Sequence, residues 1–149
     1  MRFRSAALHF RLLGWRTRAS LLPLCASALL VEIGLRTMNT ARVARLCGVP
    51  LTLTSAGPPP SDPVRSALPT WARRELDLVE SLMRHWPLDN TCLRRCLVAG
   101  RRLRPLGPSL RLGVARDSGV LRAHAWLEID GRPLDPASAI YNPLASDLQ

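Results

Sequence analysis

The chain has 149 residues and a formal net charge of +10, with 21 basic and 11 acidic residues. This length suits one domain with a buried core and is too short for two full domains. Every basic residue is arginine, which, with the many alanines, leucines and prolines, is typical of a GC-rich genome. No helix-turn-helix, zinc-finger or aromatic-platform pattern accompanies the charge, so we do not expect the chain to bind nucleic acid.

The four cysteines are Cys25, Cys47, Cys92 and Cys96. They do not form the two CxxC units of a zinc site, and Cys92 and Cys96 are spaced by one helical turn. This spacing predicts reduced thiols in the cytoplasm rather than a disulfide framework. We therefore expect no metal ion and no cofactor.

The net charge is concentrated at the N-terminus. Residues 1–50 contain eight arginines and one acid, Glu32, which is a net charge of +7. The apolar run 21–31 ends at Glu32 and is much shorter than the roughly 20 residues that a transmembrane helix requires. We expect a buried or partner-facing helix here and no association with a membrane.

The N-terminal part of the chain is predicted to be helical. Residues 6–36 have the composition of one or two apolar helices, broken near Gly14 or Pro23. The proline-rich connector TSAGPPPSDP cannot lie inside a helix or a sheet. It divides N-terminal helices and connector (1–60) from a probable catalytic unit (64–149), although the whole chain is expected to form one compact domain.

Three further helices are predicted over residues 40–46, 70–86 and 92–103. The first and the third begin at or directly after an asparagine or threonine that can cap a helix N-terminus, and in the second Thr70 precedes the apolar residues. The second has apolar residues at three- and four-residue spacing, which indicates a face packed on the core. The third places Cys92 in its first turn.

From Leu110 the apolar period changes to two, which predicts strands over 110–114 and 121–129. The dipeptide Asp130-Gly131 is a strong hairpin signal, so residues 132–135 should return as a third strand. The tail after Pro136 gives no clear pattern.

The predicted hairpin brings two residues of catalytic type together. If Ile129 faces Arg132, Asp135 is the diagonal neighbour of His124 on the same face, ~5.5–8 Å away by Cβ. A carboxylate there can orient the imidazole and stabilise its protonated form. Asp130 would be about 20 Å from His124 and is excluded.

Cys92 is the candidate nucleophile. A thiol reacts as thiolate, and the unsatisfied N–H groups at a helix N-terminus favour the thiolate. Cys96 lies one turn deeper and is interpreted as a small buried residue. The three residues Cys92, His124 and Asp135 thus supply what a cysteine hydrolase or acyl transferase of the papain and transglutaminase type requires.

These motifs also resemble a known family. The segment CLRR from Cys92, the strand RLGV, the segment HAWLE from His124 and the segment GRPL from Gly131 resemble the lasso-peptide maturation peptidases, a branch of the transglutaminase-like superfamily. The resemblance covers roughly residues 70–143. It implies an α+β fold with a papain- or transglutaminase-like core, in which the cysteine-bearing helix packs on a small antiparallel sheet that carries His and Asp.

The resemblance implies a function and partners. The chain would be a leader peptidase acting on a ribosomally made precursor peptide, with Cys92 attacking the amide, His124 transferring the proton and Asp135 orienting His124. The core peptide would then pass to an ATP-dependent, asparagine-synthetase-like cyclase. Because residues 1–60 lack a winged-helix pattern, a separate leader-binding (RiPP recognition) protein is implied.

Three other functions remain open from the sequence. The same residues serve acyl transferases, in which an amine replaces water as the acceptor. A transglutaminase-like shell can also act as a non-catalytic, peptide-binding adaptor, with Cys92 unreactive. A basic nucleic-acid binder would show salt-dependent retention on DNA.

Overall fold

The computed structural model describes residues 15–52, 64–117 and 119–144. Its helices are α2 (Trp15–Thr37), α3 (Thr40–Cys47), α4 (Thr70–Arg84) and α5 (Cys92–Arg102). Its strands are β1 (Ser109–Asp117), β2 (Val120–Ile129), β3 (Arg132–Pro133) and β4 (Asn142–Pro143). Three short 3-10 helices accompany them, η1 (Val64–Ala67), η2 (Arg104–Leu106) and η3 (Pro136–Ile140). The predicted connector TSAGPPPSDP lies outside the described residues.

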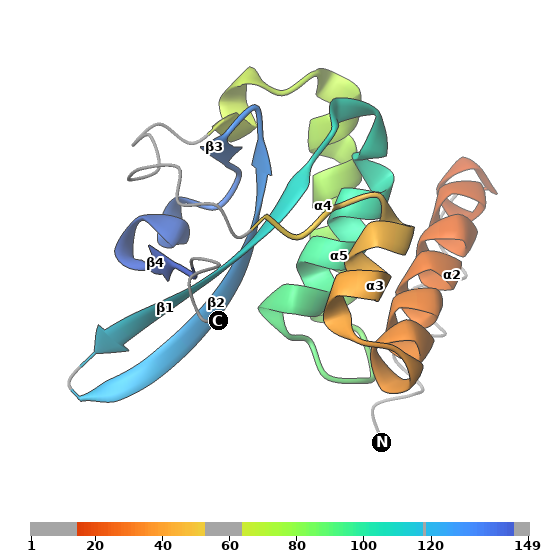
Figure 1. Cartoon of the computed structure of the whole chain (residues 1–149). Coiled ribbons are helices and arrows are strands. Elements are labelled where there is room, and N and C mark those ends of the chain that lie inside the picture. The colour runs from red at the N-terminus through yellow and green to blue at the C-terminus, as the bar shows by residue number, and fades with distance from the viewer. Residues whose placement is uncertain (1–14, 53–63, 118, 145–149) are drawn as a thin grey trace.

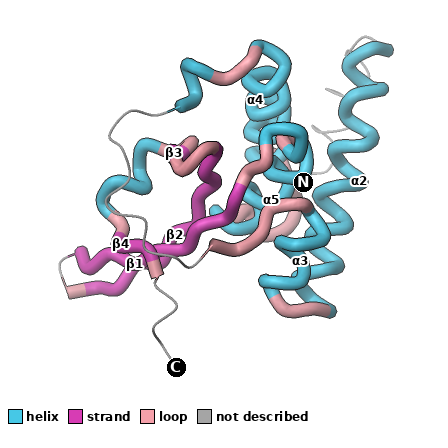
Figure 2. The backbone as a smooth tube through the Cα atoms, turned by 45° about the horizontal axis from the view of Figure 1, so that its top comes forward, coloured by secondary structure: helices cyan, strands magenta, loops and turns pink. Residues whose placement is uncertain are grey.

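The described part of the chain is a layer of helices packed on an antiparallel sheet. The four strands are ordered β3-β2-β1-β4. Figures 1 and 2 show the helices gathered on one side of the molecule, while the curved β1–β2 hairpin extends away from them. This is the α+β class that the alternating periods of the sequence predicted.

α2 is one continuous helix through Pro23, so the predicted break at this residue is wrong. Pro23 is exposed. Proline has no N–H, so the carbonyl one turn earlier loses its helical partner, and on an exposed side water can solvate it. Ser27 Oγ also donates a hydrogen bond of 2.8 Å to the Pro23 carbonyl. The alternative break at Gly14 lies outside the described residues. No helix in the described ranges combines the length and the apolar character needed to cross a membrane.

The other helices begin and end close to the predicted residues. Asn39 caps α3 by accepting a 2.9 Å hydrogen bond from the Arg42 N–H, and Gly48 ends it with a φ of 76°. A left-handed conformation at this position favours glycine. Thr91 caps α5 by accepting a 3.3 Å hydrogen bond from the Arg94 N–H. This capping confirms that Cys92 is the first residue of its helix.

The hairpin register agrees with the prediction. Ile129 pairs with Arg132, and the Leu134 N–H donates a 2.9 Å hydrogen bond to the Leu127 carbonyl. β3 itself has only two residues and is shorter than the predicted strand 132–135, because Pro133 lacks an N–H and Asp135 begins a 3-10 turn. β4 pairs with β1 at Gly113 and was not predicted.

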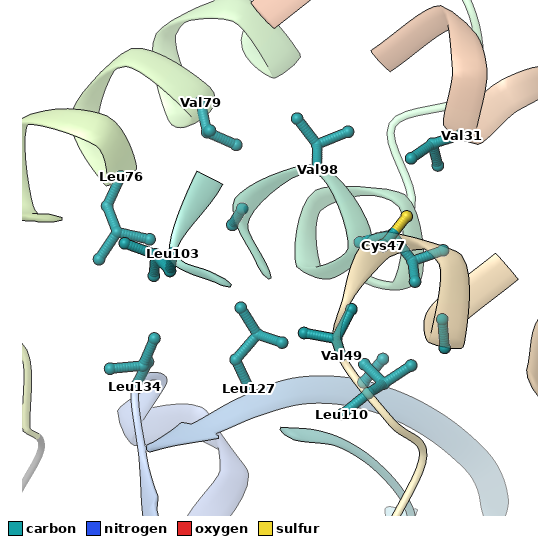
Figure 3. Packing of buried hydrophobic residues seen from close by; sticks show 14 of the residues in the cluster. Val31, Cys47, Val49, Leu76, Val79, Val98, Leu103, Leu110, Leu127 and Leu134 are labelled. Atoms are coloured by element: carbon teal, nitrogen blue, oxygen red, sulfur yellow. The ribbon is translucent and has the colours of Figure 1, made fainter. Parts of the chain in front are cut away.

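The core is centred on α5. Figure 3 shows Val98 of α5 between Val79 of α4 and Val31 of α2, with Leu110 and Leu127 of the sheet beneath. The same cluster of buried residues includes side chains from α2, α3, α4, α5 and the sheet. Packing on all these sides holds α5, whose buried residues lie in its second half, against the rest of the fold.

Candidate active site

His124 and Asp135 form a hydrogen-bonded pair. His124 Nε2 lies 2.9 Å from Asp135 Oδ2, and the His124 side chain is largely buried. The other carboxylate oxygen, Oδ1, accepts a 2.9 Å hydrogen bond from the Ala137 N–H at the start of η3. Asp135 is therefore held from both oxygens, and its backbone turn directs the carboxylate at the imidazole.

The pair defines the state of the imidazole ring. A carboxylate accepts a hydrogen bond, so the proton of neutral His124 resides on Nε2. Nδ1 is then the basic nitrogen, with its lone pair available to take a proton from a thiol. This is the arrangement that a cysteine nucleophile with a histidine base needs.

Two aromatic rings stack near His124. The Tyr141 ring stacks on it with a centroid distance of 4.8 Å, and the Trp126 ring lies at 6.2 Å. Tyr141 follows η3 in the tail that gave no sequence pattern, so this contact was missed. Its position depends on the pairing of β4 with β1.

Trp126 is fully buried and is itself fixed by polar and steric contacts. Its indole N–H donates a 3.1 Å hydrogen bond to Glu128 Oε1, and Arg111 Nε bonds the other oxygen of Glu128 at 2.9 Å. A Cβ at Gly113, which pairs with His124 in the sheet, would come within 2.7 Å of the Trp126 ring. The glycine in RLGV thus makes room for the indole.

Cys96 links α5 to the strand that carries His124. Its Sγ donates a 3.3 Å hydrogen bond to the carbonyl of Ala125, the residue after His124. Cys92 lies one turn earlier on the same face of α5, about 6 Å along the helix axis. Cys92 is also partly buried against the core cluster. The structure therefore places the second turn of α5, where Cys96 lies, at the segment of β2 that bears His124.

Three of the four cysteines have surroundings that disfavour the thiolate. All four are free thiols. Burial raises the pKa of the Cys25, Cys47 and Cys96 thiols, and for Cys96 the charges of Cys92 and Asp135 raise the pKa further. Neutral thiols are poor nucleophiles. Cys96, which is half-buried in the structure, therefore acts as a hydrogen-bond donor to the Ala125 carbonyl.

A buried ion pair fixes the first turn of α5. Glu32 of α2 is only 3% exposed, and its carboxylate bonds Arg94 Nε at 2.7 Å and Arg36 at 2.9 Å. The hydrogen bond from Arg94 holds the pKa of Glu32 below its usual range, and the charge of Arg36 acts in the same direction. In the sequence, the only sign of this pair is an acid at the end of an apolar run.

The described residues contain no group of three His, Cys, Asp or Glu side chains that could hold a metal ion. The site contains the Cys92 thiol at the N-terminus of α5, where backbone N–H donors are also available, and the His124 imidazole oriented by the Asp135 carboxylate. These groups together can carry out nucleophilic attack on a carbonyl carbon.

Comparison with known proteins gives one finding on ancestry. The sequence pattern of the transglutaminase-like superfamily matches residues 29–146, which is well over half of the chain. No curated protein and no solved structure matches the sequence of this chain. The superfamily is typically one of cysteine-dependent enzymes with peptidase or acyltransferase chemistry. From the match, together with its α+β fold, the chain belongs to the transglutaminase-like superfamily.

Proposed function

We propose that this protein is a cysteine peptidase that removes the leader from a ribosomally synthesised precursor during lasso-peptide maturation. The observation that supports the peptidase proposal is the 2.9 Å bond between His124 and Asp135. The strand that carries His124 is also bonded to α5, one turn after Cys92, through Cys96. Cys92 is the nucleophile, His124 the general base and acid, and Asp135 the residue that orients His124.

The reaction follows from these roles. Nδ1 of His124 takes the Cys92 proton while the sulfur attacks the carbonyl carbon of the scissile amide. The first N–H groups of α5 lack intrahelical partners and can stabilise the oxyanion. His124 then gives its proton to the leaving amine, which releases the core peptide. Water, deprotonated by His124, attacks the thioester, and the leader departs with a carboxylate as Cys92 regains its proton.

The lasso-peptide part of the proposal is supported by motif resemblance. The segments CLRR, HAWLE and GRPL lie at the start of α5, on β2 and around β3. A short precursor peptide would be the substrate, and an ATP-dependent, asparagine-synthetase-like cyclase would act on the released core peptide.

A separate leader-binding protein is part of the proposal, and the surface of α2 supports it. Apolar side chains at helical spacing are 49–66% exposed along this helix, namely Leu22, Leu29, Leu30 and Ile33. Exposed contiguous apolar surface is typical of a protein interface. Exposed Arg36, Arg42 and Arg45 lie on or beside this helix, so an acidic partner fits the charge.

Leader cleavage by single-cysteine variants tests the assignment of the nucleophile. Cys92→Ala should abolish cleavage of the precursor peptide, because the variant has no thiol at the helix N-terminus. Cys96→Ala should leave cleavage largely intact, because it removes only a hydrogen-bond donor. Mass spectrometry of the product, with circular dichroism to show that both variants are folded, makes the measurement. Equal losses in the two folded variants would refute the assignment.

A further inference from the structure

A cavity with a volume of about 610 Å³ lies between α4, α5, η1 and the segment that joins β3 to η3. Its size is within the range of natural ligand sites. Apolar side chains from three elements and from the segment after β3 line it, namely Leu76, Val79, Ala99, Leu127 and Leu134. We refer to it as the α4–α5 cavity. No step of the proposed mechanism uses it.

The α4–α5 cavity leads along α5 from the proposed nucleophile. Cys96 and Ala99 line it, and they share a face of α5 with Cys92 because the spacings are four and three residues. At 1.5 Å per residue, Cys96 and Ala99 lie about 6 and 10 Å from Cys92 along the axis. An extended peptide advances roughly 3.3 Å per residue, so the cavity is two or three residues from the bond at Cys92.

Asp135 connects the cavity to the catalytic pair. It lines the cavity wall and bonds His124 at 2.9 Å, so the cavity and the pair share this residue. A peptide side chain in the cavity would therefore lie beside the His124 and Asp135 pair rather than at a remote surface. The position suits a specificity subsite.

The mouth of the α4–α5 cavity carries uncompensated positive charge. Three arginines and two acids line it, and the acids already have partners: Glu80 bonds Arg65, and Asp135 bonds His124. Among the residues that the structure describes, Arg73 and Arg95 have no carboxylate partner. A ligand carboxylate at the mouth would supply one.

We propose that the α4–α5 cavity is a substrate subsite that selects peptides with a bulky apolar side chain two or three residues from the attacked bond, next to an acidic side chain. The proposal rests on the function proposed for Cys92. The apolar side chain enters the space between α4 and α5 and is removed from water. The acidic side chain stays at the mouth and pairs with Arg73 or Arg95.

Peptide electrophiles that alkylate Cys92 test the subsite without knowledge of the natural precursor. Peptidyl chloromethyl ketones extend from the reactive carbon in one chain direction, and chloroacetyl peptides extend in the other. In both, the Cys92 sulfur forms a thioether and displaces chloride. In each series, Phe or Gly stands at the second or at the third residue from the reactive carbon. The residue next to this Phe or Gly is Glu or Gln. Alkylation rates of the full chain are followed by intact mass and peptide mapping.

In one of the two series, Phe should react at least about 10-fold faster than Gly, since pockets discriminate apolar groups by this order. Ala99→Leu, which adds bulk to the cavity wall, should lower that ratio and leave the iodoacetamide rate unchanged. Glu should exceed Gln by about 2- to 5-fold, as for a surface ion pair. Arg73→Gln and Arg95→Gln should reduce this preference. Arg74→Gln is the control, because Arg74 is exposed on α4 and does not line the cavity.

Equal rates for Phe and Gly in both series, with Cys92 still reactive toward iodoacetamide, would overturn the subsite and leave the proposed function intact. A loss in Ala99→Leu common to every reagent would also overturn the subsite. A Cys92 that resists iodoacetamide and all peptides in the folded wild-type chain would instead overturn the proposed function.

Discussion

Each oxygen of the Asp135 carboxylate has a separate hydrogen-bonding partner at the residue scale. Oδ1 accepts from the Ala137 N–H, and Oδ2 meets His124 Nε2. An asparagine that keeps its oxygen on the Ala137 N–H must present its NH₂ group to Nε2. This NH₂ group donates, so the ring proton would move to Nδ1, where it blocks the acceptance of the thiol proton.

Asp135→Asn should therefore reduce kcat for leader cleavage by about 10²-fold or more, since general acid-base catalysis contributes on this order. His124→Ala should be as damaging as Cys92→Ala, because it removes the base itself. Steady-state kinetics on the precursor peptide measure both effects, and thermal melting shows whether the fold is kept. Full activity in Asp135→Asn would mean that another group orients His124.

The contact between His124 and Asp135 could be predicted from the sequence, whereas the contact with Tyr141 could not. The alternation of apolar residues along β2 and the Asp130-Gly131 turn determine the register of the hairpin. The register in turn determines which side chains are diagonal neighbours. Tyr141 lies in a segment without periodicity. Its place beside His124 depends on the pairing of β4 with β1, which no local pattern encodes.

At the scale of elements, α2 is tied to α5 by the ion pair of Glu32 with Arg94. The two residues are 62 positions apart in the sequence. Local patterns predicted each helix but not this pairing, because the partner of a buried charge is determined by packing. The uninterrupted passage of α2 through Pro23 has a similar origin, since the tertiary contacts of α2 outweigh the cost of about 3 kcal/mol for one proline inside a helix.

Glu32→Gln should lower the free energy of unfolding at pH 7 by about 1.5–3 kcal/mol, as expected for a hydrogen bond to a charged group that is buried. The matched control is Glu75→Gln, which breaks a 2.7 Å bond to Arg102 at the other end of α5. Because both of those side chains are more exposed, the loss there should be about 1 kcal/mol or less. Urea unfolding of the two variants measures the difference.

The effect of Glu32 should also depend on pH. Its pKa in the folded protein is lowered, so its contribution to stability is present above the unfolded-state pKa of about 4.3. This contribution is lost as the pH falls through the lower folded-state pKa. The gap between wild type and Glu32→Gln should therefore shrink below about pH 4. A gap that is as large at pH 3 as at pH 7 would argue against the ionised pair.

At the scale of the whole molecule, the exposed apolar side chains of α2 form a helix face that is uncovered among the described residues. In the proposed function, an acidic leader-binding protein covers this face. The purified chain alone should then tend to aggregate and cleave slowly, and addition of the partner should raise solubility and rate together.

Leu30→Gln and Ile33→Gln should weaken this stimulation by the partner and leave the iodoacetamide reactivity of Cys92 unchanged. Leu121→Gln is the matched control, because Leu121 is 66% exposed on the β1–β2 hairpin, away from α2. Leader cleavage with and without partner, together with light scattering, makes the measurement. Full activity from a monodisperse chain without partner would contradict the proposed role of this face in partner binding.

The central claim is that His124, oriented by Asp135, activates Cys92. Alkylation of the folded chain by iodoacetamide at pH 6, followed by peptide mapping, tests it most directly, because an ordinary thiol with a pKa of about 8.5 is almost entirely protonated there. Cys92 should be labelled first, well ahead of Cys25, Cys47 and Cys96, and His124→Ala should slow its labelling by about 10²-fold. Equal labelling of all four cysteines, or an unchanged Cys92 rate in His124→Ala, would contradict the claim.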